Sequence, residues 1–189
     1  MIHILLVDNN DSFTYNILEA LRANTLAKVD VLRQNQIELT QVAEYDKIIL
    51  SPGPGLPSDF PLLYQIIDEF KSNKSILGIC LGHQAICSYF GANLVKLPIV
   101  CHGQSHEINV NTNSKLYRNL PEDFNVGLYH SWAVDTSEFP QELEITGISD
   151  TQIIMSVAHN RYDLHGIQFH PESFISEHGA EILKNFIRS

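Results

Sequence analysis

Residues 76–84 read Ile-Leu-Gly-Ile-Cys-Leu-Gly-His-Gln, and this stretch joins an apolar run to a segment of helical character. Glycines two positions before and after Cys80 permit a tight strand-to-helix turn, the form of a nucleophile elbow. Such a turn exposes the central side chain beside a helix N-terminus, whose positive end favours the reactive thiolate. The alternative is a buried structural cysteine, the usual fate of an unpaired cysteine and our expectation for Cys87 and Cys101.

The elbow continues a pattern that runs through the first half of the chain. Short apolar runs at residues 4–7, 29–32, 48–50 and 76–79 are separated by longer segments with helical spacing. Helical spacing is visible in two sets of apolar residues: Phe13, Ile17 and Leu21, and Leu63, Ile66, Ile67 and Phe70. We expect a buried parallel sheet, with each helical set facing it.

Closely spaced strand candidates follow Gly91, and they are too close together for helical crossovers. They span residues 92–97, 106–110, 126–132, 143–149, 153–159 and 164–169. Antiparallel pairing is therefore expected. A final helix is expected at about residues 177–187, with apolar residues on one face. The predicted fold is one α/β domain over residues 1–189, an open, mixed, mostly parallel sheet flanked by helices, with additional antiparallel strands in the second half.

Composition excludes several classes of function. The 189 residues carry a formal net charge of -10, and phosphate binding would require clustered Lys and Arg, so we expect no nucleic-acid partner. No apolar run reaches membrane-spanning length, and residues 1–7 lead directly into a strand pattern without a basic flank or cleavage site. Three cysteines cannot form a fully paired disulfide framework. These features predict a soluble cytoplasmic protein.

A Pro-Gly loop follows the apolar run that ends at Leu50: residues 51–57 read Ser-Pro-Gly-Pro-Gly-Leu-Pro. Prolines have no N–H, so the loop can present an isolated backbone donor at the carboxyl edge of the sheet. The N–H groups of Gly53 and Leu81 could then form an oxyanion hole for acyl transfer. The alternative is a Pro-Gly turn with no catalytic role.

Residues 168–173 read Gln-Phe-His-Pro-Glu-Ser at the end of the last strand candidate. In extended backbone, side chains two positions apart point the same way, so His170 and Glu172 can meet. A carboxylate bonded to one imidazole nitrogen fixes the tautomer and stabilises the imidazolium. A surface histidine with a nearby acid is the alternative, but the joint occurrence of elbow, donor loop and His-x-Glu favours a catalytic triad with Cys80.

The remaining histidines show no spacing typical of a zinc site, and we expect neither a metal nor a cofactor. Residues 129–132, Tyr-His-Ser-Trp, end a strand candidate and could form either a substrate wall or ordinary packing.

These residues resemble the class I (triad) glutamine amidotransferases, and most closely the glutaminase subunits of anthranilate synthase (component II) and 4-amino-4-deoxychorismate synthase. The similarity covers nearly the whole chain. It rests on residues 7–16, 51–55, 78–84, 129–131 and 168–173 in order. The resemblance implies the single-domain fold of that family.

The resemblance also implies roles. Cys80 attacks the side-chain amide of L-glutamine, His170 protonates the departing ammonia, and water hydrolyses the thioester. Gly53 and Leu81 form the oxyanion hole, and the residues that hold glutamine are Gly53, Gly55, Leu81, Gln84, Ser131 and Trp132. Trp132 stands where the family usually has Leu, and Asn10 where it commonly has Tyr. The implied partner is a chorismate-using synthase chain that receives ammonia through a tunnel in a hetero-oligomer.

Other functions are compatible with parts of the pattern. A thiol hydrolase of γ-glutamyl compounds or peptides could use the same Cys and His. A non-enzymatic regulatory subunit is disfavoured because all three triad positions are filled. The sequence does not choose between tryptophan and folate biosynthesis, because one glutaminase subunit can serve both synthases.

Overall fold

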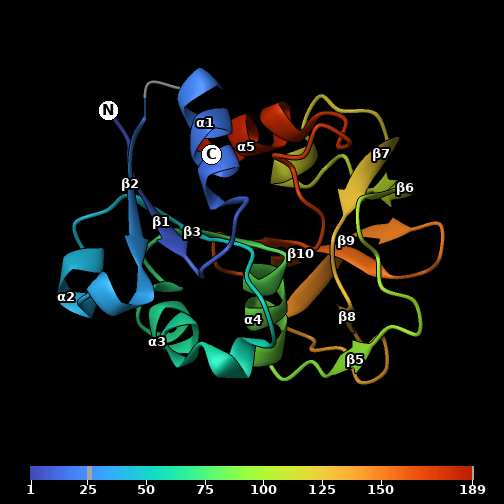
Figure 1. The fold of residues 1–189 in the computed structure, drawn as a ribbon, viewed down its shortest axis with the longest axis horizontal. Helices are drawn as coiled ribbons and strands as arrows, with labels where there is room; N and C mark the ends of the chain where they lie inside the picture. Colours follow the sequence, from blue (N-terminus) through green and yellow to red (C-terminus); the bar gives the residue numbers. More distant parts are fainter. Residues whose placement is uncertain (25–26, 189) are drawn as a thin grey trace.

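The computed structural model describes residues 1–24 and 27–188. In this part of the chain, a mixed sheet has the strand order β2-β1-β3-β4-β11-β10-β9-β6-β7, and helices cover both of its faces (Figure 1). Its strands are β1 (His3–Asp8), β2 (Lys28–Arg33), β3 (Lys47–Leu50), β4 (Ser75–Ile79), β6 (Gln104–Val110), β7 (Asp123–Leu128), β9 (Leu143–Ser149), β10 (Ile154–His159) and β11 (Leu164–Ile167). A small second sheet pairs β5 (Leu94–Lys96) with β8 (Trp132–Val134).

Five α-helices lie within the described residues: α1 (Thr14–Asn24), α2 (Leu39–Val42), α3 (Pro61–Phe70), α4 (Leu81–Tyr89) and α5 (Gly179–Arg188). Short 3-10 helices occur at Gln34–Gln36, Pro57–Asp59 and Lys115–Tyr117. No helix in this part of the chain has the length and apolar character needed to cross a membrane.

The predicted parallel half is confirmed, since β2, β1, β3 and β4 are parallel neighbours. Alternating side chains of β1 divide the core between the two faces of the sheet. Ile4 and Leu6 pack in the cluster that contains the apolar residues of α1 and α5. Leu5 and Val7 pack in the cluster of α3 and α4. All four are fully buried, which explains why β1 reads as a continuous apolar run.

The second half is antiparallel, as predicted, with one important exception. Strands β6, β7, β9 and β10 pair antiparallel with their neighbours. β11 pairs antiparallel with β10 but parallel with β4, so it joins the two halves of the sheet. The prediction for residues 164–169 was therefore wrong about the partner on one side. The parallel pairing aligns Ile167 with Ile79 and places the end of β11 beside Cys80.

The expected strand over residues 126–132 is divided in two. β7 ends at Leu128, and the chain then leaves the large sheet to pair with β5 as β8. Between them, Nδ1 of His130 bonds the carbonyl oxygen of Trp132 at 2.8 Å. This local contact satisfies Nδ1 of a buried imidazole, and residues 129–131 line a cavity instead of continuing the strand.

Phe13 does not belong to the buried helical face on which its spacing placed it. α1 begins one residue later, at Thr14, and Ile17 and Leu21 are the residues that face the sheet. The Phe13 ring lies 5.1 Å from the His170 ring and 5.0 Å from the Tyr129 ring, measured between centroids. The final helix begins slightly later than expected, at Gly179, and its residues Ile182, Leu183, Phe186 and Ile187 are buried.

Candidate active site

Cys80 occupies the tight turn that the glycine pattern predicts. It lies directly between β4 and α4 with φ 52 and ψ -100, so a residue other than glycine adopts a positive φ. Such a conformation is strained and persists only where the surrounding structure enforces it. The turn places the Cys80 sulfur at the N-terminus of α4, where the helix dipole favours a negative charge.

The two flanking glycines are required because backbone segments pass very close to them. A Cβ at Gly78 would lie 2.4 Å from the carbonyl carbon and oxygen of Gly82. A Cβ at Gly82 would lie 2.3 Å from the carbonyl oxygen of Leu50 in β3. Both distances are well below van der Waals contact with backbone atoms. The turn can therefore form only where both positions lack a side chain.

His170 and Glu172 meet as predicted, with Nδ1 of His170 bonded to a carboxyl oxygen of Glu172 at 2.7 Å. The predicted reason was wrong: the two residues are not on extended backbone. The segment turns, and the N–H of Ser173 bonds the His170 carbonyl oxygen at 3.2 Å. Because a carboxylate oxygen only accepts, Nδ1 is the donor, and Nε2 is the nitrogen available to Cys80.

The His170 ring is nearly inaccessible: the side chain is 2% exposed, and that of Glu172 is 0% exposed. Burial alone would lower the pKa of His170, but its interactions with Cys80 and Glu172 outweigh burial and raise the pKa to about 10. Nε2 has no hydrogen-bond partner of standard geometry among the described residues, and it is the ring nitrogen left to interact with Cys80, both as a hydrogen-bond donor and through charge. An imidazolium at neutral pH can donate a proton to a leaving group.

The Pro-Gly loop is held at the carboxyl edge of the sheet by Asn9, a residue to which the sequence patterns assigned no such role. The Asn9 side chain donates to the carbonyl oxygen of Ser51 at 2.8 Å, and the Asn9 N–H donates to Ser51 Oγ at 3.0 Å. Gln34 donates to Oδ1 of Asn9 at 2.8 Å. Asn9 is fully buried, so this chain of hydrogen bonds fixes the base of the loop that carries Gly53.

A pocket of about 150 Å³ brings most of the predicted site residues together. It is lined by Gly53, Pro54, Gly55, Cys80, Gln84, Tyr129, His130, Ser131 and Trp132. The pocket is smaller than the ~300 Å³ at which pockets for drug-sized ligands begin, which suits a small substrate such as a single amino acid. Residues 129–132 therefore form a wall of the cavity, one of the two alternatives that their sequence left open.

Two features near Cys80 and His170 were not predicted from the sequence. Phe13 and Tyr129 pack their rings against His170. Gln168 is fully buried, and its Nε2 lies 3.6 Å from the Cys80 sulfur. The only local signal was the position of Gln168, two residues before His170, which gives both side chains the same direction as they leave β11.

Burial controls the protonation of two other histidines and of the two other cysteines. Burial lowers the pKa of His83 to about 3 and that of His130 to about 4, so both rings stay neutral near pH 7. Burial also raises the pKa of the Cys87 and Cys101 thiols. All three cysteines are unpaired. Within the described residues, no group of three or more His, Cys, Asp or Glu side chains is arranged to hold a metal ion.

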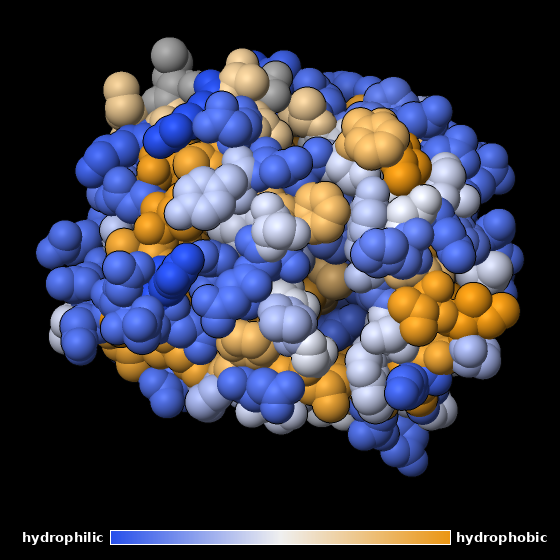
Figure 2. Space-filling view, viewed as in Figure 1, coloured by the Kyte–Doolittle hydropathy of each residue, from blue (hydrophilic) through white to orange (hydrophobic). Residues whose placement is uncertain are grey.

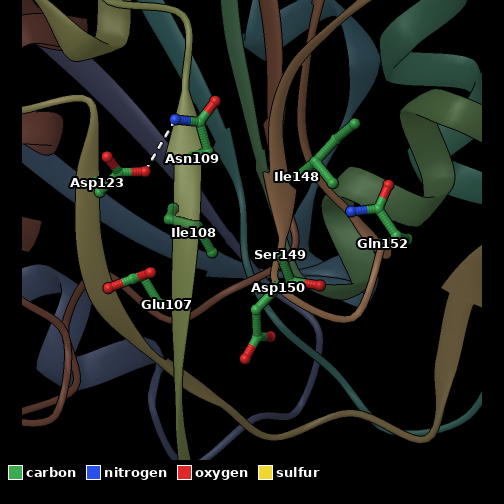
Figure 3. A pocket seen from close by; sticks show the side chains of 8 residues that line it. All are labelled: Glu107, Ile108, Asn109, Asp123, Ile148, Ser149, Asp150 and Gln152. Carbon is green, nitrogen blue, oxygen red and sulfur yellow. Dashed lines mark hydrogen bonds between the residues drawn. The ribbon is translucent and has the colours of Figure 1, made fainter.

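A second hollow lies where β6 and β9 meet, far along the sheet from Cys80 in strand order (Figure 3). Its polar lining includes the carboxylates of Glu107, Asp123 and Asp150. Asn109 donates to Asp123 at 2.8 Å across its rim. None of the residues predicted for catalysis or substrate binding lines this hollow.

Known proteins resemble this chain along nearly its whole length. Residues 5–189 match the family glutamine amidotransferase class-I. The anthranilate synthase component 2 of Porphyra purpurea is 39% identical over 189 residues, which cover 98% of this chain and 99% of that protein. The aminodeoxychorismate synthase component 2 of Escherichia coli K12 is 37% identical over 189 residues, covering 97% of this chain and 98% of that protein.

Solved structures show the same fold. A Thermoplasma acidophilum protein, provisionally described as part of a GMP synthase, superposes with a TM-score of 0.89 and 26% sequence identity. The match covers 100% of this chain and 93% of that chain.

Proposed function

The chain belongs to the class I glutamine amidotransferases, and on that premise we propose that it hydrolyses L-glutamine to glutamate and ammonia through Cys80, His170 and Glu172. The observation that carries this proposal is the convergence of three features at one sheet edge. A strained cysteine at a helix N-terminus lines a small pocket, and a buried imidazole bonded to a buried carboxyl group interacts with that cysteine.

In the first step, the Cys80 thiolate attacks the side-chain carbonyl carbon of glutamine. The carbonyl π electrons move to oxygen, and the resulting oxyanion is stabilised by the N–H groups of Gly53 and Leu81. Leu81 is the first residue of α4, so its N–H has no carbonyl partner four residues earlier in the helix. The base of the Gly53 loop is held by Asn9, which keeps its donor in place before substrate arrives.

The imidazolium of His170 then donates its Nε2 proton to the departing nitrogen. The C–N bond breaks, ammonia leaves, and a glutamyl thioester remains on Cys80. Neutral His170 next removes a proton from water, whose oxygen attacks the thioester carbonyl carbon. Collapse of this second intermediate releases glutamate, restores the thiolate and leaves His170 protonated. Glu172 orients the ring throughout and stabilises its charge.

Glutamine is held by the walls of the pocket. We assign Gly53, Gly55, Leu81, Gln84, Ser131 and Trp132 to this role, and all of them except Leu81 line the cavity. The carbonyl oxygen of Trp132 already accepts a hydrogen bond from Gln84 at 2.9 Å, so the tryptophan contributes main-chain atoms to the site. This explains how Trp can replace the smaller side chain usual in the family.

The ammonia is proposed to pass to a chorismate-using synthase chain, because two relatives are components of anthranilate and aminodeoxychorismate synthases. Four exposed apolar residues are close in sequence to residues at the candidate site: Tyr15, Ile99, Val100 and Phe174. Each lies within two residues of a group that packs on or near the site. On the face drawn in Figure 2, apolar residues form several separate patches among hydrophilic ones. Three unpaired cysteines suit a reducing compartment, and we place the complex in the cytoplasm.

The decisive experiment compares two nitrogen sources in the reconstituted complex. Cys80→Ser should abolish product formation from glutamine and leave product formation from added ammonium salt largely intact, because the synthase can take ammonia directly. Cys87→Ser, at a buried cysteine outside the pocket, is the matched control and should retain both activities.

The outcomes separate the proposal from its alternative. Loss of both activities by Cys80→Ser in a normally assembled complex would contradict the assignment. Turnover of γ-glutamyl peptides in preference to glutamine would favour a thiol hydrolase, which could use the same triad.

A further inference from the structure

Gln168 lies beside the reacting sulfur because of strand pairing. The parallel register of β11 and β4 aligns Ile167 with Ile79, and the Cys80 N–H donates to the Ile167 carbonyl oxygen at 2.8 Å. Gln168 directly follows the last residue of β11, and its side chain lies next to Cys80. Its Nε2 lies 3.6 Å from the Cys80 sulfur, and the residue is fully buried.

The orientation of the Gln168 amide is fixed by a chain of hydrogen bonds. The carbonyl oxygen of Trp132 can only accept, so the Gln84 group that faces it at 2.9 Å must be the amide nitrogen. The same nitrogen donates to Oε1 of Gln168 at 3.1 Å. With its oxygen committed to Gln84, Gln168 turns its NH₂ group toward Cys80. An amide nitrogen has no lone pair to offer, so this contact is a donation to sulfur.

A donor aimed at sulfur stabilises the thiolate more than the thiol, because hydrogen bonds to charged acceptors are stronger. The site is buried, which strengthens the interaction further. Cys80 also acts as leaving group when the thioester is hydrolysed, so the same donor serves both steps. An apolar residue of equal length would fill the space equally well but would donate nothing.

We propose that Gln168 is a catalytic residue: its amide N–H donates to the Cys80 sulfur, and its amide oxygen holds Gln84 in the orientation that presents the Gln84 carbonyl to the pocket. Both amide hydrogens of Gln84 are taken by Trp132 and Gln168, so only the Gln84 oxygen is left to meet a substrate. That oxygen suits a donor, such as the α-ammonium group of an amino acid. This role rests on the proposed glutaminase function.

Two variants separate the donor from the acceptor function. Gln168→Met keeps the approximate length and removes both groups. Gln168→Glu keeps oxygens that can accept from Gln84 but, when ionised, donates nothing to sulfur. Gln65→Met, at an exposed position of α3, is the matched control. The pH dependence of Cys80 alkylation by iodoacetamide, followed by peptide mass spectrometry, measures the thiol without any substrate.

Gln168→Met should move the midpoint of Cys80 alkylation to higher pH by about one unit, equivalent to roughly tenfold less thiolate at a given pH, the lower end for a bond to a charged group. Gln168→Glu should move it at least as far, because an ionised carboxylate beside the sulfur also repels the thiolate. Both variants should lower kcat for glutamine, and Gln168→Met alone should also raise KM markedly. Alkylation profiles identical to wild type would overturn the proposal. A wild-type chain that alkylates at Cys80 but fails to hydrolyse glutamine with its partner would instead contradict the proposed function.

A measurement on the wild-type chain covers the case in which the Gln168 variants do not fold. The side-chain amide ¹H–¹⁵N resonances of Gln168 should shift as Cys80 ionises, and this pH dependence should vanish in Cys80→Ala. The Gln34 amide, which donates to Asn9, should show no such change. Identical Gln168 titrations in the wild type and in Cys80→Ala would exclude the contact with sulfur and overturn the proposal.

Discussion

At the scale of single residues, the chemistry depends on how buried polar groups share their hydrogen bonds. His170 gives one ring nitrogen to Glu172 and keeps the other for Cys80. The carboxyl group is fully buried, and its second oxygen has no partner among the described residues. Cys80 and Glu172 therefore stabilise a positive charge on the His170 ring. Burial alone would keep that ring neutral, as it does for His83.

This balance predicts how His170 titrates. Its pKa is raised to about 10, so in the wild type the ring should stay protonated through neutral pH. Cys80→Ala removes the leading favourable interaction, and the pKa of His170 should therefore fall. Imidazole NMR between pH 5 and 10 follows the titration of His170 in the wild type and in Cys80→Ala. His83, whose pKa is about 3, is a neutral control. Unchanged titration of His170 would show that Cys80 does not stabilise its charge.

At the scale of secondary-structure elements, the site forms where loops meet at the carboxyl ends of β1, β3, β4 and β11. Parallel strands place these ends at one edge, which is the usual position of sites in open sheets. The Gly53 loop after β3 packs against both Asn9 and the first residue of α4. A Cβ at Gly53 would lie 2.5 Å from Cδ2 of Leu81 and 2.8 Å from Cβ of Asn9.

Gly53→Ala is therefore expected to displace the loop from Cys80. Loss of one oxyanion donor costs ~100-fold or more in kcat, and overpacking costs ~1–3 kcal/mol in the free energy of unfolding. Alkylation of Cys80 by iodoacetamide needs no oxyanion hole and should remain near wild type. Steady-state glutaminase assays and the alkylation rate test this together. A kcat close to wild type would mean that the Gly53 N–H does not contact the oxyanion.

At the scale of the whole molecule, a network of polar side chains lies at the sheet edge opposite the candidate site. Asp163 accepts hydrogen bonds from Ser75 Oγ, from Lys115 Nζ at 2.8 Å and from His165 Nε2 at 3.0 Å. Ser75 begins β4, and Asp163 directly precedes β11, so the network lies at the amino ends of these strands. Burial alone would raise the pKa of Asp163, but these hydrogen bonds outweigh it and hold the pKa well below its usual range.

Asp163→Asn should lower the free energy of unfolding by ~1–3 kcal/mol, because the donors lose a charged acceptor and an NH₂ group replaces one of its two oxygens. A depressed carboxyl pKa contributes stability above the unfolded-state value near 4, which is lost as pH falls toward the folded value. The difference from wild type should therefore shrink below about pH 4. Urea unfolding at several pH values tests this. Glu69→Gln, on the exposed side of α3, is the control.

Glutaminase turnover should be nearly unchanged in Asp163→Asn, since the network lies at the edge remote from Cys80. Equal stability of Asp163→Asn and wild type at pH 7 would contradict the prediction.

The effect of the synthase partner on glutamine hydrolysis is also a property of the whole molecule. The isolated chain should hydrolyse glutamine slowly, and a chorismate-loaded partner should raise turnover, because an acyl-transfer site responds to small loop shifts. Phe174 is 96% exposed and lies two residues after Glu172. Phe174→Ala should weaken binding of the partner, by ~1 kcal/mol or more if the ring is an anchor. Calorimetry and assays with and without chorismate test this.

The control for Phe174→Ala is Glu44→Ala, at an exposed position just before β3 and thus at the opposite edge. Equal turnover alone, with partner, and with partner plus chorismate would refute the coupling and leave the triad assignment standing.

Local patterns in the chain were sufficient to predict the parallel half of the sheet, the elbow at Cys80 and the pairing of His170 with Glu172. The sheet and the elbow depend on residues close in sequence, through apolar periodicity or through glycines around one turn. His170 and Glu172 are also close in sequence, but they meet through a turn and not through the period of two that predicted their contact. The placement of β11 against β4 could not be obtained in this way, because both neighbours offer a compatible apolar face. The choice depends on how all the strands and helices pack together.

The surroundings of the catalytic atoms followed from that choice. Gln168 meets a sulfur 88 positions earlier in the chain, and Asn9 holds a loop 42 positions later. Phe13, which has helical spacing, packs on His170 instead of the core. Buried polar groups must find partners wherever the fold brings them, so hydrogen bonds between distant residues are decided by strand register and burial, which no local pattern encodes.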